Sequence, residues 1–325
     1  MLKPTYLALL TGAVLGLAPP AHAQSWPTRP ITVVVSQAAG NSPDVLCRII
    51  VDKIGRALGQ QFVVENRTGA ANLVGTQAVA RAAPDGYTFL FATSAALVTN
   101  PYTFKKLPYD PIKDFVPVAM VARSNHVLLV NPDVKANTLA ELIALDKSTP
   151  GSLTMAIDGT RNISGLIAQS INKQAGTGFV LVPYNTNTNA VQDIVTGRIQ
   201  VTIQSASVAE PFIASKSLRP LAVAGSARIA SMPDVPAIAE TLQSVDLQGW
   251  FMFMAPAGTP PEIVQKLSAE VARAINSPEV QERAPTLGFD LRVGDAVTPG
   301  GAKQFLDAEL ASTGKAIQSL GIQPE

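Results

Sequence analysis

The sequence has few of the side chains from which most catalytic and metal sites are built. It contains one cysteine and two histidines in 325 residues, and only Cys47 and His126 lie beyond the first 23 residues. A single cysteine excludes an internal disulfide, and a zinc site with several Cys or His ligands is excluded as well. G-x-S-x-G and Walker motifs are also absent. The side chains most often used in catalysis are therefore missing. We expect no catalytic residues, metal or cofactor, in a protein that is not an enzyme.

An excess of charge of either sign is also missing. The chain has 25 Lys and Arg residues against 24 Asp and Glu residues, and Lys3 lies in the segment that we expect to be removed. This balance provides no basic field for nucleic acid or an anionic membrane, so neither is expected as a partner. With 47% hydrophobic residues, the remaining chain is long enough for two modest domains.

Long apolar runs are absent after the first residues. Residues 1–23 have the pattern of a signal peptide: Lys3, an apolar stretch from Tyr6 to Leu17, and a small-x-small site at Ala21-His22-Ala23. The mature chain is then expected to begin near Gln24 and to reside in the periplasm. An uncleaved anchor is the alternative, although this apolar stretch is short for a membrane span.

The stretch from Ile31 to Gly59 predicts a strand, a loop of small residues and a helix. Residues 31–35 are an unbroken apolar run, typical of a strand buried on both faces. Ser42 is expected to cap the helix, with Pro43 and Asp44 in its first turn, and Gly59 is expected to end it. Such a loop presents backbone N–H groups at the positive end of a helix, where α/β proteins bind anions.

The same unit recurs later in the chain. Strands at 153–157 and 179–182 are each followed by a polar loop and a helix, as predicted from apolar spacing. Two changes of pattern, near 124 and 249, predict that the chain crosses into a second lobe and returns. The sequence thus predicts an α/β protein with domain 1 at 24–124 and 249–325 and domain 2 at 125–248, and a cleft between the two lobes.

Several helix starts can also be predicted from capping residues. Thr138 with Glu141, and Thr259 with Glu262, have the spacing of capping boxes. Asn189 is expected to cap the helix that ends near Gly197. The proline-rich run 232–236 is expected to lead into one more helix.

The residues also resemble a known family, the periplasmic solute receptors of tripartite tricarboxylate transporters, of the Bug type. The matching stretches cover nearly the whole chain after residue 25. They are WPTRPITVVV (26–35), AAG (38–40), VVENRTGA (63–70), AVARAAPDGYTFLFATS (78–94), KKLPYDPIKDFVPVA (105–119), VNPDVKANTLAEL (130–142), VPYN (182–185), LRPLAV (218–223), MPDVPAIAE (232–240) and APAGTP (255–260). The resemblance implies a type II periplasmic-binding-protein fold, with two mixed or parallel sheets flanked by helices and the ligand between the lobes.

The resemblance also implies a function and a site. A small carboxylate is held between the lobes and delivered to the membrane permease subunits of the transporter, by a receptor that we expect to be a monomer. Carried over to this sequence, the ligand-binding residues are Ser36, Gln37, Ala38, Ala39, Gly40, Asn41, Asp44, Thr93, Ser94, Asp158, Gly159, Thr160, Arg161, Asn162, Tyr184, Asn185, Asn187, Gln204 and Ser205.

Some of these residues have two interpretations. Asp44 would either complement the dipole of its own helix or contact a ligand amine, hydroxyl or water. Arg161 would either bind a second carboxylate of the ligand or pair locally with Asp158. The first alternative favours a dicarboxylate ligand. His126 is interpreted as a structural histidine, and Trp250 and Phe251 as packing residues of the lobe or hinge.

The chain departs from the family pattern mainly in the loops that would touch the ligand, at 36–41, 158–162 and 185–189. The scaffold is therefore expected to be kept while the chemistry of the pocket differs. Two rival functions are a sensory receptor, which would use the same ligand trap with another membrane partner, and a secreted hydrolase. The hydrolase would need His126 as its base.

Overall fold

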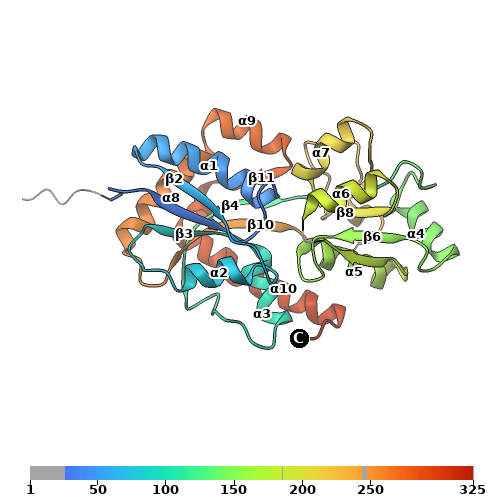
Figure 1. The fold of residues 1–325 in the computed structure, drawn as a ribbon, viewed down its shortest axis with the longest axis horizontal. Coiled ribbons are helices and arrows are strands. Elements are labelled where there is room, and N and C mark those ends of the chain that lie inside the picture. Colours follow the sequence, from blue (N-terminus) through green and yellow to red (C-terminus); the bar gives the residue numbers. More distant parts are fainter. Residues whose placement is uncertain (1–25, 185, 244–246, 325) are drawn as a thin grey trace, which may run out of the picture.

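The computed structural model describes residues 26–184, 186–243 and 247–324. The predicted signal peptide and Asn185 lie outside the described residues. Within these ranges the strands form two sheets, each flanked by helices on both faces (Figure 1). We call the six-stranded sheet with its helices the first lobe, and the five-stranded sheet with its helices the second lobe.

The first sheet has the strand order β11-β4-β10-β3-β1-β2. Its strands are β1 (Ile31–Val35), β2 (Phe62–Asn66), β3 (Thr88–Thr93), β4 (Phe115–Ser124), β10 (Gly249–Pro256) and β11 (Phe289–Leu291). Strand β1 runs parallel to β2 and β3, whereas β10 runs antiparallel to β3 and β4. Val33 and Val35 belong to the core on one face and Val34 to the core on the other. The prediction of a strand buried on both faces is therefore confirmed.

Helices cover both faces of this sheet (Figure 1). One core contains residues of α1 (Ser42–Leu58), α8 (Pro261–Ile275), α9 (Pro278–Thr286) and the 3₁₀ turn η3 (Gly294–Val297). On the opposite face lie α2 (Leu73–Ala80), the π-helical turn η1 (Ala95–Thr99), α3 (Asn100–Thr103) and the long α10 (Pro299–Leu320).

The second sheet has the order β7-β6-β8-β5-β9. Its strands are β5 (His126–Val130), β6 (Thr154–Ile157), β7 (Val180–Pro183), β8 (Val201–Ser205) and β9 (Arg219–Val223). One face packs on α4 (Leu139–Ser148), α5 (Ile163–Ala175) and the turn η2 (Ile238–Glu240), and the other on α6 (Asn187–Val195) and α7 (Ala206–Ala214).

The chain passes from the first sheet to the second between β4 and β5, and it returns immediately before β10. The two crossings are joined to each other by a hydrogen bond of 3.2 Å from Gln248 Nε2 to Asn125 Oδ1. Asn125 Nδ2 donates to Gly288 O at 3.1 Å, which ties the crossing to the end of α9. The mixed two-sheet α/β fold predicted from the sequence is confirmed. Within the described ranges, no helix has the length and apolar character that a membrane span needs.

Two of the capping predictions hold. Gly59 follows α1 in the left-handed conformation with φ of 63°, which glycine adopts without steric cost. Thr138 caps α4, because its side chain accepts a hydrogen bond from the N–H of Glu141.

Other capping predictions are wrong. The cap position of α1 is Asn41, and the Ser42 hydroxyl instead bonds the hydroxyl of Ser124 at 3.1 Å. Thr186 caps α6 by accepting from the N–H of Asn189, so Asn189 lies inside the helix. A threonine three residues before the expected cap therefore outcompetes the asparagine.

Two further predictions, of a helix cap at Thr259 and of a helix after residues 232–236, are also wrong, and both lie next to prolines. The Thr259 hydroxyl donates to Pro256 O at 2.8 Å, and α8 begins after Pro260 without a side-chain cap. Among the described residues between 236 and β10, the chain forms only the 3₁₀ turn η2, not a full helix.

Candidate functional site

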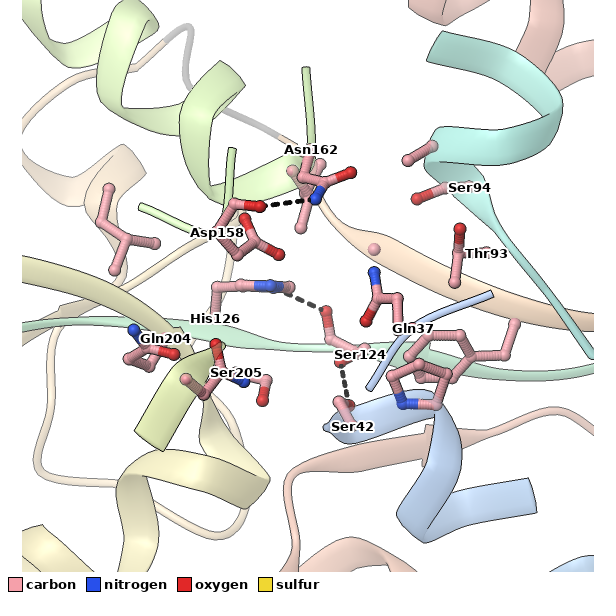
Figure 2. Close-up of a pocket in the computed structure, with 17 residues that line it drawn as sticks. Gln37, Ser42, Thr93, Ser94, Ser124, His126, Asp158, Asn162, Gln204 and Ser205 are labelled. Carbon is pink, nitrogen blue, oxygen red and sulfur yellow. Dashed lines mark hydrogen bonds between the residues drawn. The ribbon is translucent and has the colours of Figure 1, made fainter. Parts of the chain in front are cut away.

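A cavity between the two lobes brings together residues from both sheets, and we call it the inner cavity (Figure 2). Its empty space is about 480 Å³, a value that includes the open solvent at its mouth. It is lined by Gln37, Ser42, Pro43, Thr93, Ser94, Ala95, Ser124, His126, Asp158, Asn162, Ile163, Asn187, Ile203, Gln204, Ser205, Gly249 and Phe251.

The starts of four helices meet at this cavity. Its lining includes Ser42 and Pro43 of α1, Asn162 and Ile163 at the start of α5, Asn187 of α6 and the α7 cap residue Ser205. The N–H groups of a first helical turn have no partner within the helix, and they carry the positive end of its dipole. The cavity therefore collects partial positive charge from both lobes, although its lining contains no Lys or Arg.

The arrangement follows from the strand–loop–helix units. Helix α5 follows β6, and α7 follows β8, which runs parallel to β6. Carboxyl ends of parallel strands meet at one edge of a sheet, so the helices that follow begin there. Strand β3 in the first lobe supplies Thr93 and leads to Ser94 at the same cavity. The Thr93 hydroxyl accepts from the N–H of Ala96 at 3.4 Å, which fixes this turn.

Two titratable residues line the inner cavity, and both lie on its second-lobe wall (Figure 2). Burial raises the pKa of Asp158 to about 6, an effect opposed by the hydroxyl of Ser164, which donates to its Oδ1. Burial lowers the pKa of His126 to about 4, against a backbone hydrogen bond to Ser124 that favours the charged form. At neutral pH the imidazole is therefore uncharged and the carboxylate is largely ionised.

A second cavity adjoins the first, and we call it the outer cavity. The two share Gln37, Asp158, Asn162 and Asn187. The outer cavity is lined by Ser36, Gln37, Ala38, Asn41, Thr68, Gly69, Ala70, Ala71, Asn72, Asp158, Gly159, Thr160, Arg161, Asn162, Pro183, Tyr184 and Asn187. The cationic side chain in the lining of the outer cavity is that of Arg161. The guanidinium carbon of Arg161 lies 4.4 Å from the ring centre of Phe104, a residue of the first lobe.

Asp44 anchors the loop that follows β1. Its carboxylate accepts hydrogen bonds from Gly40 N at 2.9 Å, Arg48 Nε at 2.9 Å and Asn66 Nδ2 at 3.0 Å. Burial acts to raise the pKa of Asp44, but these bonds outweigh it and lower the pKa below its ordinary value. Asp44 lines neither cavity. The contacts agree with its interpretation as a residue that supports its own helix start.

The first-lobe wall of the outer cavity contains a backbone of unusual conformation. Ala70, Ala71 and Asn72 follow one another with φ of 46°, 52° and 73°, a region that costs a non-glycine residue of order 1 kcal/mol. Tertiary hydrogen bonds keep this segment in its strained conformation. Asn100 Nδ2 donates to Ala71 O at 2.8 Å, and Ser36 Oγ donates to Asn72 Oδ1 at 3.3 Å.

Asn72 also connects the lobes across the cleft. Its Nδ2 donates to Asn162 Oδ1 at 3.0 Å. Farther away, Lys173 of α5 donates to the carbonyl of Ser319 in α10. Together with the Arg161–Phe104 contact, these bonds hold the lobes against each other in the form described.

The loop 158–162 fits closely against the helix that follows it. A Cβ on Gly165 would lie 2.3 Å from Gly159 O, so only glycine permits this approach. Asn162 Nδ2 donates to Asp158 O at 2.7 Å and closes the loop (Figure 2). The loop is thereby fixed where Asp158 lines both cavities and Arg161 lines the outer one.

Most residues predicted from the sequence to bind the ligand do meet at these cavities. The inner one contains Gln37, Thr93, Ser94, Asp158, Asn162, Asn187, Gln204 and Ser205, and the outer one adds Ser36, Ala38, Asn41, Gly159, Thr160, Arg161 and Tyr184. Ala39 and Gly40 are exposed and, like Asp44, line neither cavity. Asn185 lies outside the described residues.

Sequence reasoning missed several lining residues. His126, interpreted as structural, lines the inner cavity and is 7% exposed. Phe251 also reaches the cavity while it packs on Phe91 and Phe289. Ser124 and the loop 68–72 were missed as well. His126 and Ser124 flank the predicted crossing between lobes, which was the one signal that could have placed them at the cleft.

Comparison with known proteins identifies the family. The model of the tripartite tricarboxylate transporter family receptor matches residues 46–322. This chain belongs to that family. The resemblance predicted from the sequence is thus confirmed. A UPF0065 protein of Bordetella bronchiseptica is 37% identical over 287 residues, which are 88% of this chain and 85% of that protein.

Two solved structures resemble this one closely. Rpa4515 of R. palustris, described with adipate, has a TM-score of 0.88 at 30% identity, covering 92% of this chain and 100% of that chain. MatC of Rhodopseudomonas palustris, described with bound malate, has a TM-score of 0.84 at 29% identity, covering 90% and 100%.

Membership has consequences for the function. The family consists of periplasmic solute receptors and not of enzymes. The rival hydrolase is thereby set aside, although His126 does line the cleft.

Proposed function

We propose that the protein captures a small carboxylated metabolite, preferably a dicarboxylate, between its lobes and delivers it to the permease subunits of a tripartite tricarboxylate transporter. It would act as a monomer in the periplasm after removal of residues 1–23. The lobes would be the domains 24–124 with 249–325, and 125–248. The observation that carries the proposal is the convergence of four helix starts on one cavity without Lys or Arg in its lining.

The energetics of such a site are adequate for a transport receptor. Hydrogen bonds from neutral N–H groups to a carboxylate contribute about 1.5–3 kcal/mol each. Micromolar affinity corresponds to about 8 kcal/mol. Two or three N–H contacts supply about 3–9 kcal/mol before the cost of association, and apolar burial against Phe251 and Ile163 adds to this value.

The outer cavity supports a second acidic group on the ligand. Arg161 lines it beside Tyr184, and Asp158 and Asn162 line both cavities. A guanidinium is suited to bidentate binding of a carboxylate. Two similar solved structures are described with adipate and with malate, which are both dicarboxylates.

The contacts between the lobes support capture by closure. Asn162 and Arg161 contact first-lobe residues directly, at Asn72 and over Phe104. These two residues belong to the loop that would hold the ligand. Ligand binding and closure would therefore depend on the same loop.

Calorimetric titration with matched acids tests the proposal. The chain 24–325, shown to be free of bound acid by mass spectrometry under denaturing conditions, is titrated with adipate and hexanoate. We expect one site and tighter binding of adipate. Arg161→Ala should weaken adipate about tenfold and hexanoate little, whereas the control Arg198→Ala, a 76% exposed side chain, should change neither. If no mono-, di- or tricarboxylate produces binding heat, the proposed function is wrong.

A further inference from the structure

The charges that line the inner cavity are unusual for a site that binds only anions. Asp158 and His126 are its titratable residues, and its lining holds no Lys or Arg. The adjoining outer cavity adds Arg161 and Tyr184 to the titratable groups that face this space. The one cationic side chain of the two linings therefore lies in the outer cavity, while the inner cavity contains a carboxylate.

The Asp158 carboxylate is only partly satisfied by the protein. Oδ1 accepts from the hydroxyl of Ser164, and the other hydrogen bonds of this residue use its backbone. Among the described residues, Oδ2 has no hydrogen-bond partner, and the residue lines both cavities. A carboxylate oxygen that faces a ligand cavity without a partner is an acceptor for a donor on the ligand.

His126 provides a second acceptor on the same wall. Its Nδ1 lies 3.3 Å from Ser124 O. A carbonyl oxygen only accepts, so Nδ1 carries the hydrogen and Nε2 of the neutral ring is an acceptor. A Cβ on Gly249 would lie 3.3 Å from His126 Cε1, so the ring is packed in place against the strand β10. The wall formed by Asp158 and His126 thus accepts hydrogen bonds, whereas the helix starts around it donate them.

We propose that Asp158 is a specificity-determining residue and selects, among small carboxylates, those that also carry an ammonium group. This inference rests on the proposed function and names its substrate class more narrowly. The ligand carboxylate binds the helix N–H groups, and its ammonium group lies between Asp158 Oδ2 and His126 Nε2.

Charge explains why an ammonium group fits this wall. A plain carboxylate would enter beside an ionised Asp158, and two neighbouring carboxylates cannot both stay ionised at low cost. Such a ligand would bind only with uptake of a proton. An ammonium group neutralises Asp158 without proton uptake, and its N–H groups match both acceptors. A site whose buried acceptors require a donor discriminates strongly against the analogue that lacks it.

The test uses pairs of acids that differ only in the amino group: succinate with L-aspartate, glutarate with L-glutamate, and adipate with L-2-aminoadipate. Dissociation constants are measured by calorimetry at pH 7.5 on the ligand-free chain 24–325. In the pair that binds best, we expect the amino acid to bind at least about tenfold more tightly than its partner. Asp158→Asn should reduce that ratio about tenfold or more. The control Asp133→Asn, an exposed carboxylate of the second lobe, should leave the ratio unchanged.

The pH dependence provides a readout that a merely structural role of Asp158 would not change. Lowering the pH from 7.5 to 5.5 should weaken binding of the amino acid, because it needs ionised Asp158. The same change should strengthen binding of the acid without the amino group. Both trends should be lost in Asp158→Asn, which keeps the shape of the side chain and its acceptor for Ser164.

Three results would overturn the inference. One is equal or tighter binding of the acid without the amino group. Another is tighter binding of malate than of aspartate, which would make the ligand donor a hydroxyl. The third is an unchanged ratio in Asp158→Asn. If only the acids without an amino group bind, the inference is wrong but the protein is still a carboxylate receptor. If the acids of neither series bind, the proposed function and the inference are both wrong.

Discussion

Asp44 allows a quantitative test of how the loop after β1 is held. Asp44→Ala removes an acceptor that is 4% exposed and that binds Gly40 N, Arg48 and Asn66. Breaking a buried charge pair typically costs about 3–5 kcal/mol. Arg48 is 50% exposed and can be rehydrated, so we expect a loss of about 3 kcal/mol in the free energy of unfolding. Urea unfolding at pH 7 measures this value.

The same helix contains a matched control. Asp52 pairs with Arg56 at 2.8 Å in the same i, i+4 geometry, but both side chains are at least half exposed. Asp52→Ala should therefore cost less than about 0.5 kcal/mol. Equal losses for the two variants would show that Asp44 does not hold the loop. The pKa of Asp44 is lowered in the folded protein, so its contribution should persist above about pH 4 and disappear as the pH falls through the folded pKa.

Three further substitutions test residues in and around the cavities. Asn72→Gly removes the side-chain bonds to Asn162 and Ser36 while keeping a residue suited to φ of 73°. It should weaken ligand binding about fivefold by calorimetry, and an unchanged affinity would show that these bonds do not favour closure. Gly165→Ala should weaken ligand binding more than about tenfold, because the added Cβ would displace the loop 158–162. Gly300→Ala is the control, because there is open space around Gly300. Equal ligand affinities of the two variants would contradict the close fit of the loop. His126 has a pKa of about 4 in the folded protein, so as the pH falls below 6.5 its imidazole takes up a proton in the unfolded chain before it does so in the folded one. Between pH 7 and 4.5, the free energy of unfolding of the wild type, measured in urea, should therefore fall by about 2–3 kcal/mol relative to that of His126→Gln. Parallel pH profiles of the two proteins would contradict this.

The sequence predicted the fold well because its local signals agree with tertiary packing. Val33, Val34 and Val35 are apolar without alternation, and the strand is buried on both faces. Gly59 follows the last apolar position of its helix and takes the left-handed conformation. Where two capping residues compete, the local signal is ambiguous, and Thr186 caps the helix instead of Asn189.

The site was predicted less completely, because it depends on contacts between distant segments. Asp158 was expected at the site because the family resemblance places a second-lobe ligand loop there, and it does line both cavities. The loop 68–72 has no comparable local signal. Its position results from the hydrogen bonds of Asn72 with Ser36 and Asn162, residues far away in the chain. The support of Gly40 by Asp44 likewise depends on side-chain geometry that spacing does not reveal.

A crystal structure of the chain with its tightest-binding small acid tests the central claim most directly. We expect a ligand carboxylate in the inner cavity, with its oxygens about 2.7–3.2 Å from first-turn N–H groups of α1 and α5. A ligand bound elsewhere, or a carboxylate directed away from these helix starts toward solvent, would contradict it.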